Sequence, residues 1–184
     1  KNSKQKMYPA STTKIMTALV TLENAKLDRL VVIDEKYTGI EGSSVYLKAG
    51  EVLTIRDLLY ALMLESANDA ATALAYEVGG SIEEFAELMN KKANEIGAYS
   101  THFTNPHGLH DDDHYTTAQD MMKITKHAMT FPSFMEISTQ VVSYILGQDR
   151  YPLVTTNSLI DPIRGGKYYY KYAKGIKTGY DTPA

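Results

Sequence analysis

With 184 residues, 43% of them hydrophobic and 22% charged, the chain suits one globular domain of ordinary size with a buried core. Its net charge of −3 argues against a surface for nucleic acid or anionic membranes, and no apolar run is long enough to cross a bilayer. The absence of cysteine suits an oxidising exterior, although many cytosolic proteins also lack cysteine.

The predicted elements are mostly helices, with short strand-forming segments nearer the two ends. Three helix starts carry a capping residue followed three positions later by an acidic one: Thr54 with Asp57, Ser81 with Glu84, and Thr117 with Asp120. The predicted helices cover residues 15 to about 22, 55 to about 64, 70 to about 78, 82 to about 96, 118 to about 129, and a short stretch from 132. The predicted strands cover residues 30–33, 45–47, 141–145 and 175–180, and the tyrosines at 168–172 are expected to pack within strand and loop.

The first candidate site lies at residues 9–14, Pro-Ala-Ser-Thr-Thr-Lys, just before an apolar run predicted to be a buried helix. Ser11 falls at or just before the first helical turn, and Lys14 lies three residues on, on the same face. A lysine there can take the proton of the serine if burial or nearby positive charge lowers its pKa towards neutral. Alone, such a pattern more often marks a helix cap beside a solvated lysine.

Two further stretches change that interpretation. Residues 65–69, Glu-Ser-Ala-Asn-Asp, lie between two apolar helical runs, and residues 177–180 are Lys-Thr-Gly-Tyr. Separately, Ser66 and Asn68 could cap a helix, and residues 177–179 could end a strand. Together, Ser-x-x-Lys, Ser-x-Asn and Lys-Thr-Gly in this order resemble the motif set of penicillin-binding proteins and class A β-lactamases.

Over nearly its whole length the chain resembles the serine-type D-alanyl-D-alanine carboxypeptidases, which are low-molecular-weight penicillin-binding proteins. The likeness is weakest over residues 158–173 and is carried by residues 8–19, 42–51, 57–59, 66–71, 107–109 and 175–180. It implies an α/β (α+β) fold of the β-lactamase/transpeptidase type, in which an antiparallel sheet lobe packs against a helical lobe. Residues 1–184 would form a single penicillin-binding catalytic domain that is incomplete, with strands missing before the first motif and beyond Ala184.

The resemblance implies serine peptidase chemistry through an acyl-enzyme. Ser11 would attack the carbonyl of the penultimate D-alanine of a peptidoglycan stem pentapeptide, with Lys14 as the base. Ser66 would relay a proton to the leaving amine, and the backbone N–H groups of Ser11 and Tyr180 would form the oxyanion hole. The remaining implied site residues hold or border the substrate: Asn68, His107, Lys177, Thr178, Gly179 and Tyr180.

The resemblance also implies a cellular setting. The enzyme would work outside the cytoplasm in the bacterial cell envelope, either secreted or anchored to the outer face of the cytoplasmic membrane. Its partners would be the stem peptide and, as covalent inhibitors, β-lactam antibiotics. No cofactor, metal or nucleic acid is expected, and membrane association would come only through parts outside this chain.

Residues 107–114 combine histidines and aspartates, residue types that suit zinc. The segment is predicted to be a loop, with no helical register that would aim these side chains at one point. A solvated, charge-rich loop is therefore preferred to a metal site, with His107 still bordering the active site.

Two alternative functions stay open. A class A β-lactamase shares the fold and the acyl-enzyme but uses a glutamate after the second motif to activate the deacylating water. No glutamate lies between Glu95 and Glu136, so slow turnover of a penicillin acyl-enzyme is expected. The other alternative is a truncated, non-catalytic module that binds stem peptides without turning them over. With the neighbouring strands missing, the central strand of the sheet would be unpaired and would expose its backbone groups.

Overall fold

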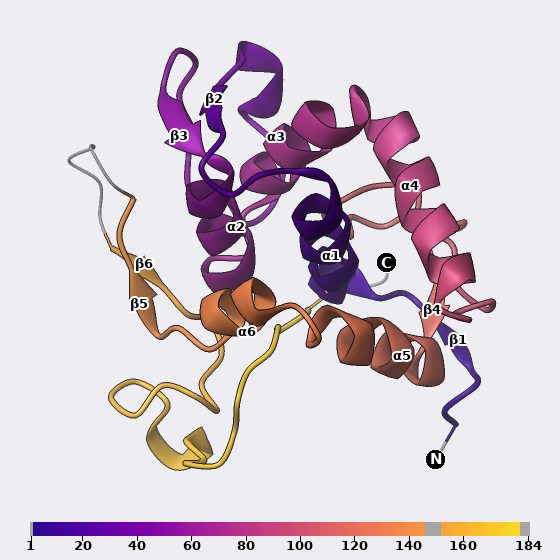
Figure 1. The fold of residues 1–184 in the computed structure, drawn as a ribbon. Helices are drawn as coiled ribbons and strands as arrows, with labels where there is room; N and C mark the ends of the chain where they lie inside the picture. Colours follow the sequence, from indigo (N-terminus) through magenta and orange to yellow (C-terminus); the bar gives the residue numbers. More distant parts are fainter. Residues whose placement is uncertain (1, 146–151, 181–184) are drawn as a thin grey trace.

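A computed structural model describes residues 2–145 and 152–180 (Figure 1). The helices of this described part are α1 (Lys14–Asn24), α2 (Ile55–Leu64), α3 (Asn68–Gly79), α4 (Ile82–Glu95), α5 (Ala118–Ala128) and α6 (Pro132–Ser138). Its short 3₁₀-helices are η1 (Ala10–Thr13), η2 (Glu35–Tyr37) and η3 (Gly166–Tyr168). Its strands are β1 (Lys6–Met7), β2 (Leu30–Val32), β3 (Val52–Thr54), β4 (Thr116–Thr117), β5 (Val142–Ser143) and β6 (Leu153–Val154). No helix in these two ranges combines the length and apolarity that a membrane crossing requires.

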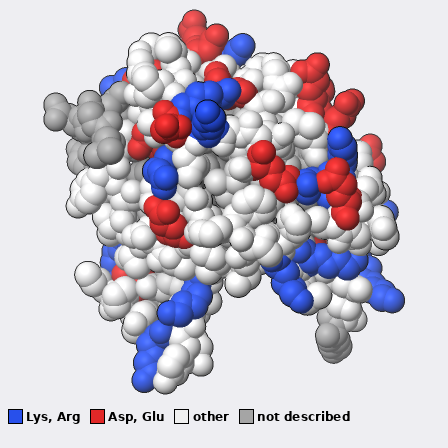
Figure 2. All heavy atoms as spheres, viewed as in Figure 1, with Lys and Arg blue, Asp and Glu red and all other residues white. Residues whose placement is uncertain are grey.

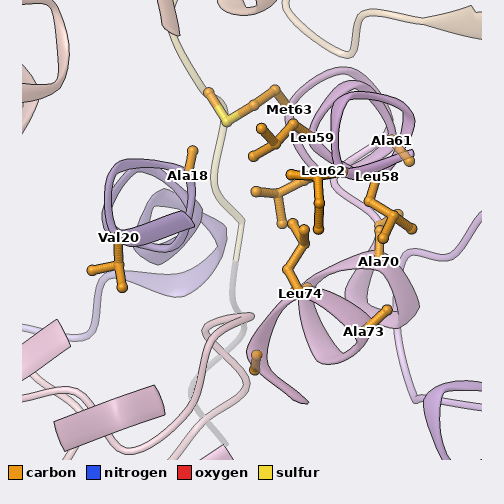
Figure 3. Close-up of a cluster of buried hydrophobic side chains, with 14 of the residues drawn as sticks. Ala18, Val20, Leu58, Leu59, Ala61, Leu62, Met63, Ala70, Ala73 and Leu74 are labelled. Carbon is orange, nitrogen blue, oxygen red and sulfur yellow. The ribbon is translucent and has the colours of Figure 1, made fainter. Parts of the chain in front are cut away.

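Helix α1 lies at the centre of the helical lobe. Residues 14–21 of this helix are all buried, and it contacts α2, α3, α4, α5 and α6. Figure 3 shows Leu62 of α2 and Leu74 of α3 meeting in the apolar space beside α1. Full burial of one such leucine stabilises a fold by roughly 1.5–3 kcal/mol. The structure therefore confirms the buried helix predicted after residues 9–14.

The helices begin where the capping signals predict. Thr54 Oγ1 accepts a hydrogen bond from the Asp57 N–H at 3.0 Å, and the Asp57 carboxylate accepts one from the Thr54 N–H at 2.9 Å. Ser81 and Thr117 cap α4 and α5 by accepting the N–H three residues further on. These bonds satisfy N–H groups that have no partner within their own helix.

In the part of the chain that the structure describes, the strands form three separate two-stranded antiparallel sheets, which pair β1 with β4, β2 with β3, and β5 with β6. In the β2–β3 sheet Leu30 pairs with Thr54, which confirms a strand in the segment predicted over residues 30–33. Strand β5 covers only the middle of the strand predicted over residues 141–145. Together with the helical lobe, these small sheets form a mixed α/β fold that agrees with a truncated form of the expected architecture.

Two predicted strands are wrong. Residues 45–47 form a loop, in which the Leu47 N–H donates to the carboxylate of Asp69 instead of to a strand. Residues 175–180 have no regular secondary structure, and no described segment pairs with them. A strand forms only where a neighbour takes up its backbone hydrogen bonds. The sheet expected to carry Lys-Thr-Gly is therefore not formed around that motif in the described part of the chain.

Residues 158–174 form an excursion that projects from the body of the molecule (Figure 1). Asp161 stabilises the turn at residues 161–164, because its carboxylate accepts hydrogen bonds from the N–H groups of Ile163 and Arg164 and from the Arg164 guanidinium. Figure 2 shows acidic and basic side chains scattered over the upper half of a mostly uncharged face, and lysine or arginine at the end of the lower-left projection. The expected packing of the tyrosines is wrong, since more than half of the surface is exposed at Tyr168, Tyr170 and Tyr172.

Candidate active site

The Ser-x-x-Lys motif spans the junction between η1 and α1. Thr12 fastens this turn, because its N–H and its hydroxyl both donate to the Pro9 carbonyl, at 3.1 and 2.6 Å. Ala10 has a φ of +48°, which is strained for a residue other than glycine. The turn leaves Ser11 partly exposed and buries Lys14 completely, with Lys14 Nζ 3.2 Å from Ser11 Oγ. Ser11 therefore faces the lysine and does not cap the helix.

The Lys14 amine has three polar neighbours. Besides Ser11 Oγ, they are Asn68 Oδ1 and the His107 carbonyl oxygen, each 2.7 Å away. A neutral amine has two N–H donors and one lone pair. The two carbonyl oxygens can only accept, so they take both N–H groups and leave the lone pair for the Ser11 hydroxyl. A general base that activates a serine requires this arrangement.

The charge state of Lys14 follows from its surroundings. Its pKa falls from 10.5 to about 6, first because burial penalises the charged amine and second because Lys177 places another positive charge nearby. The carboxylate of Asp69 acts in the opposite direction. Lys14 is therefore mostly neutral at pH 7, and both conditions that the sequence analysis set for a catalytic lysine are present.

The second motif lies in the turn between α2 and α3. Ser66 is buried and has a φ of +60°, and Asn68 is the first residue of α3. The Asn68 amide is held at both ends, since Oδ1 accepts from Lys14 and Nδ2 donates to the Glu41 carbonyl at 2.6 Å. A direct hydrogen bond thus joins the first two motifs, and Ser66 occupies the turn just before that bond.

A loop at residues 104–109 packs against the nucleophile turn, which we define as residues 9–14. The Asn105 side chain fixes the shape of this loop, because its Oδ1 accepts the Gly108 N–H at 2.7 Å. Gly108 has a φ of +88°, and a Cβ there would lie 1.9 Å from the Ala10 carbonyl oxygen, so only glycine fits. The backbone carbonyl of His107, and not its imidazole, receives the hydrogen bond from the buried amine.

The third motif meets the nucleophile turn from the far end of the chain. Gly179 packs so closely that a Cβ there would lie 3.0 Å from Thr12 Cγ2 and 3.2 Å from the Thr12 nitrogen. The Thr178 hydroxyl lies 2.8 Å from the hydroxyl of Thr156, which ties the motif to the segment after β6. Residues of all three motifs are therefore gathered around one turn.

Lys177 brings a second buried amine to the site. Its Nζ donates to the Thr178 carbonyl at 2.8 Å, and burial lowers its pKa to about 8. Lys177 therefore keeps its positive charge at pH 7, and this charge adds to the larger effect of burial in lowering the pKa of Lys14. Tyr180, next in the chain after Gly179, is 84% exposed.

The histidine and aspartate side chains of residues 107–114 differ in burial and do not converge on one point. Within the described ranges, no three His, Asp or Glu side chains lie where they could hold one metal ion. Burial, together with the positive charge of Lys14, lowers the pKa of His107 to about 3, and its Nδ1 accepts the Leu109 N–H at 3.2 Å. Residues 111–113 are exposed, whereas His114 is buried.

Asp69 is a site residue that the sequence analysis missed. It is fully buried, and its carboxylate accepts hydrogen bonds from the Ser44 hydroxyl at 2.6 Å and the Leu47 N–H at 2.9 Å. The residue thereby holds the loop at 43–47 against the start of α3. Its position directly before the helix predicted at 70 to about 78 was a usable signal, because acidic residues are favourable near the N-terminus of a helix.

Thr13 and His114 were also missed. His114 Nε2 lies 2.8 Å from Thr13 Oγ1, although the two residues are 101 positions apart in the chain. No local pattern in the sequence signals a contact across that separation.

The family model described as D-alanyl-D-alanine carboxypeptidase matches residues 1–184. The D-alanyl-D-alanine carboxypeptidase DacF of Bacillus subtilis is 36% identical over 98% of this chain and 46% of its own length. DacB2 of Mycobacterium tuberculosis is 36% identical over 96% of this chain and 59% of its own length. The chain thus spans about half the length of these curated relatives.

Solved structures agree with the sequence matches. A D-alanyl-D-alanine carboxypeptidase from Mycobacterium tuberculosis H37Rv has a TM-score of 0.88 and 35% identity, and the match covers 96% of this chain and 65% of that one. The Streptomyces K15 DD-transpeptidase has a TM-score of 0.84 and 32% identity, with coverage of 96% and 72%. The helical lobe and small sheets therefore correspond to part of this DD-peptidase fold.

Proposed function

Because this chain belongs to the D-alanyl-D-alanine carboxypeptidase family, we propose that it is the catalytic part of a serine-type enzyme that removes the terminal D-alanine from peptidoglycan stem pentapeptides. One observation carries the proposal: a buried, neutral Lys14 amine contacts both Ser11 and Asn68. An amide hydrolase that works through an ester needs an activated hydroxyl and a base on a rigid support, and the η1–α1 junction supplies both. Penicillins would acylate the same serine.

Acylation starts when Lys14 Nζ takes the proton of Ser11 Oγ as that oxygen bonds to the carbonyl carbon of the penultimate D-alanine. The carbonyl oxygen becomes an oxyanion, for which the backbone N–H groups of Ser11 and Tyr180 are the donors, each worth roughly 3 kcal/mol. The C–N bond then breaks, and the proton taken up by Lys14 passes through the Ser66 hydroxyl to the nitrogen of the leaving D-alanine, which returns Lys14 to its neutral form. Water hydrolyses the ester, which restores Ser11 and releases the shortened peptide.

Substrate binding uses the other motif residues. Lys177 attracts the terminal carboxylate, since it keeps its charge at pH 7, and the Thr178 hydroxyl donates to the same group. Asn68 holds the peptide amide through Nδ2, which donates to the Glu41 carbonyl in the free protein. Substrate binding therefore exchanges that hydrogen bond for one to the peptide. His107, Gly179 and Tyr180 border the bound peptide.

The proposal extends to the completeness of the domain and to where the enzyme works in the cell. Residues 1–184 form one catalytic domain, and strands outside this chain complete its sheet. The lack of a described partner for residues 175–180 supports this, and so does the greater length of the solved relatives. The enzyme acts outside the cytoplasm in the cell envelope, and membrane association comes from parts outside this chain.

A fluorescent penicillin tests the proposal on this chain and on the full-length gene product that contains it. We expect stable labelling that disappears with Ser11→Ala. The matched control is Ser100→Ala, which removes the hydroxyl of an exposed serine and leaves labelling unchanged. Labelling that survives Ser11→Ala would place the nucleophile elsewhere.

Two further assays separate the alternatives. Release of D-alanine from diacetyl-Lys-D-Ala-D-Ala supports the peptidase, whereas binding of the peptide without release supports a non-catalytic module. Rapid, repeated hydrolysis of nitrocefin would contradict the peptidase and favour a β-lactamase.

A further inference from the structure

We propose that His114 is a positioning residue for acylation, because its imidazole bridges the nucleophile turn and the loop that holds the Lys14 amine. The inference rests on the proposed function and adds a residue that belongs to none of the three motifs. His114 touches neither Ser11 nor Lys14 in the contacts described above, so it would act through the two segments that it joins.

The hydrogen bonds of His114 determine its tautomer. The ring is 98% buried, and its Nδ1 lies 3.0 Å from the Thr104 nitrogen. A backbone N–H can only donate, so Nδ1 is the unprotonated acceptor. The proton of the neutral ring is then on Nε2, which donates to Thr13 Oγ1 at 2.8 Å. Any side chain that replaces His114 must therefore accept at one end and donate at the other.

The two partners of His114 belong to the two segments that carry and orient the catalytic amine. Thr13 belongs to the nucleophile turn and directly precedes Lys14 in the chain. Thr104 begins the loop at residues 104–109, whose His107 carbonyl accepts the hydrogen bond from Lys14 Nζ. The bridge thus holds the backbone that carries the lysine at a set distance from the carbonyl that orients its amine.

The surroundings of His114 keep the bridge neutral. Burial lowers its pKa to about 4, and its ring packs against that of Phe103 in a T-shaped arrangement with 5.5 Å between ring centroids. A proton on Nδ1 would remove the acceptor for the Thr104 N–H, so the bridge needs the neutral ring. The titratable groups that influence His114 or are influenced by it are His102, His107, His110 and Asp111.

Loss of the bridge is expected to slow chemistry more than binding. The Lys14 amine acts on Ser11 across 3.2 Å, and a misplacement of about 1 Å in an active site can lower a rate by about 100-fold. The groups proposed to bind the substrate carboxylate, Lys177 and Thr178, have no hydrogen bond to His114 among the described contacts. The Michaelis constant for a peptide substrate should therefore change little.

Two half-replacements test the bridge in the full-length gene product. His114→Asn keeps an acceptor near the Nδ1 position and loses the bond to Thr13, whereas His114→Gln keeps a donor near the Nε2 position and loses the bond to Thr104. We expect each to lower the acylation rate with a fluorescent penicillin by about 10-fold or more, and to lower kcat with little change in KM. His127→Gln, which removes a partly exposed imidazole on α5, is the matched control and should react like the parent protein.

A double-mutant cycle shows whether Thr13 receives the effect. Thr13→Val should slow acylation as His114→Asn does, and the double variant should be no slower than either single one, because both remove the same hydrogen bond. Thr13→Ser keeps the hydroxyl and should retain the rate. Additive effects, unchanged rates, or rate losses that only follow the loss of folded protein seen by circular dichroism would overturn the proposal.

Failure of the proposed function and failure of this inference give different results. If the parent protein itself is not acylated, the proposed function fails and this inference fails with it. If the parent is acylated normally and the His114 variants are unimpaired, only the role of His114 is rejected.

Discussion

The proposed function requires Lys14 and Lys177 to carry different charges at the same pH. Lys14 must lose its proton to act as a base, and its pKa is about 6. Lys177 must keep its proton to attract a carboxylate, and its pKa is about 8. The acylation rate is therefore expected to rise as the pH increases through about 6 and to fall as it increases through about 8.

Lys177→Gln should change the shape of this pH profile in a specific way. It removes the positive charge that helps to lower the pKa of Lys14, so the rising limb should move to higher pH. The falling limb should disappear, because the group that titrates there is gone. Acylation rates with a fluorescent penicillin across both limbs measure the change, and Lys167→Gln, at an exposed lysine of η3, is the control. A rising limb that stays in place would mean that Lys177 does not influence the base.

The individual site residues were predictable to different degrees. The three-residue spacing of Ser11 and Lys14 was enough to place their side chains together, because the periodicity of a helical turn is a local property. Bringing Asn68 and Lys177 to the same turn required the resemblance to a family. His114 and Thr13 could not be predicted, since their contact depends on how a distant loop packs against the turn.

At the scale of the elements, the start of α3 and the loop at 43–47 form one unit held by Asp69. Asp69→Asn replaces a carboxylate that accepts from the Ser44 hydroxyl and the Leu47 N–H. The free energy of unfolding should fall by about 1–3 kcal/mol, because buried donors lose a charged acceptor. Urea denaturation measures the change, and Asp112→Asn, at an exposed aspartate, is the control.

The same variant has a second readout in the pH profile. Asp69 raises the pKa of Lys14, so Asp69→Asn should move the rising limb of acylation to lower pH, opposite to the shift expected for Lys177→Gln. A shift in the same direction for both variants would contradict the assignment of charges around the base. An unchanged stability would show that the loop is held by other contacts.

Helices were predicted far better than strands. The starts of α2, α4 and α5 follow from capping residues and from apolar periodicity, both of which lie within a dozen residues of sequence. The segments at 45–47 and 175–180 have strand-like composition, yet composition says nothing about whether a neighbour is present. A segment forms a strand only when a neighbouring strand takes up its backbone hydrogen bonds, and the sequence pattern alone does not identify that neighbour.

For the whole molecule, the central position of α1 explains how distant motifs meet. The nucleophile turn is at the N-terminal end of α1, and the α2–α3 turn, the loop at 104–109 and residues 177–179 each reach it from another part of the chain. A helix buried on more than one face is surrounded by other elements, so its end becomes a place where several segments converge. That convergence could be predicted only through the family resemblance.

The buried lysine should also be visible in the stability of the whole protein. Between pH 6 and 10.5 the unfolded chain binds a proton at Lys14 that the folded chain does not. The contribution of Lys14 to stability should therefore increase with pH across this window, by up to about 1.4 kcal/mol per pH unit, and be lowest below it. Urea denaturation of the parent protein and of Lys14→Met at several pH values measures this, and their difference should move in favour of the parent as the pH rises. A difference independent of pH would mean that Lys14 stays charged in the folded protein and cannot be the base.

The tight contacts of Gly108 and Gly179 with the nucleophile turn limit how such a protein can escape antibiotics. A Cβ at Gly108 would lie 1.9 Å from the Ala10 carbonyl oxygen, which leaves no room for it, and a Cβ at Gly179 would lie 3.0 Å from Thr12 Cγ2, which is a tight contact. A mutation that adds bulk at either position to exclude a large drug by its shape would first push on the turn that carries Ser11. If the chain acts as proposed, resistance gained in this way would also impair its peptidase reaction, so we expect resistant lineages to change other positions or the amount of protein made.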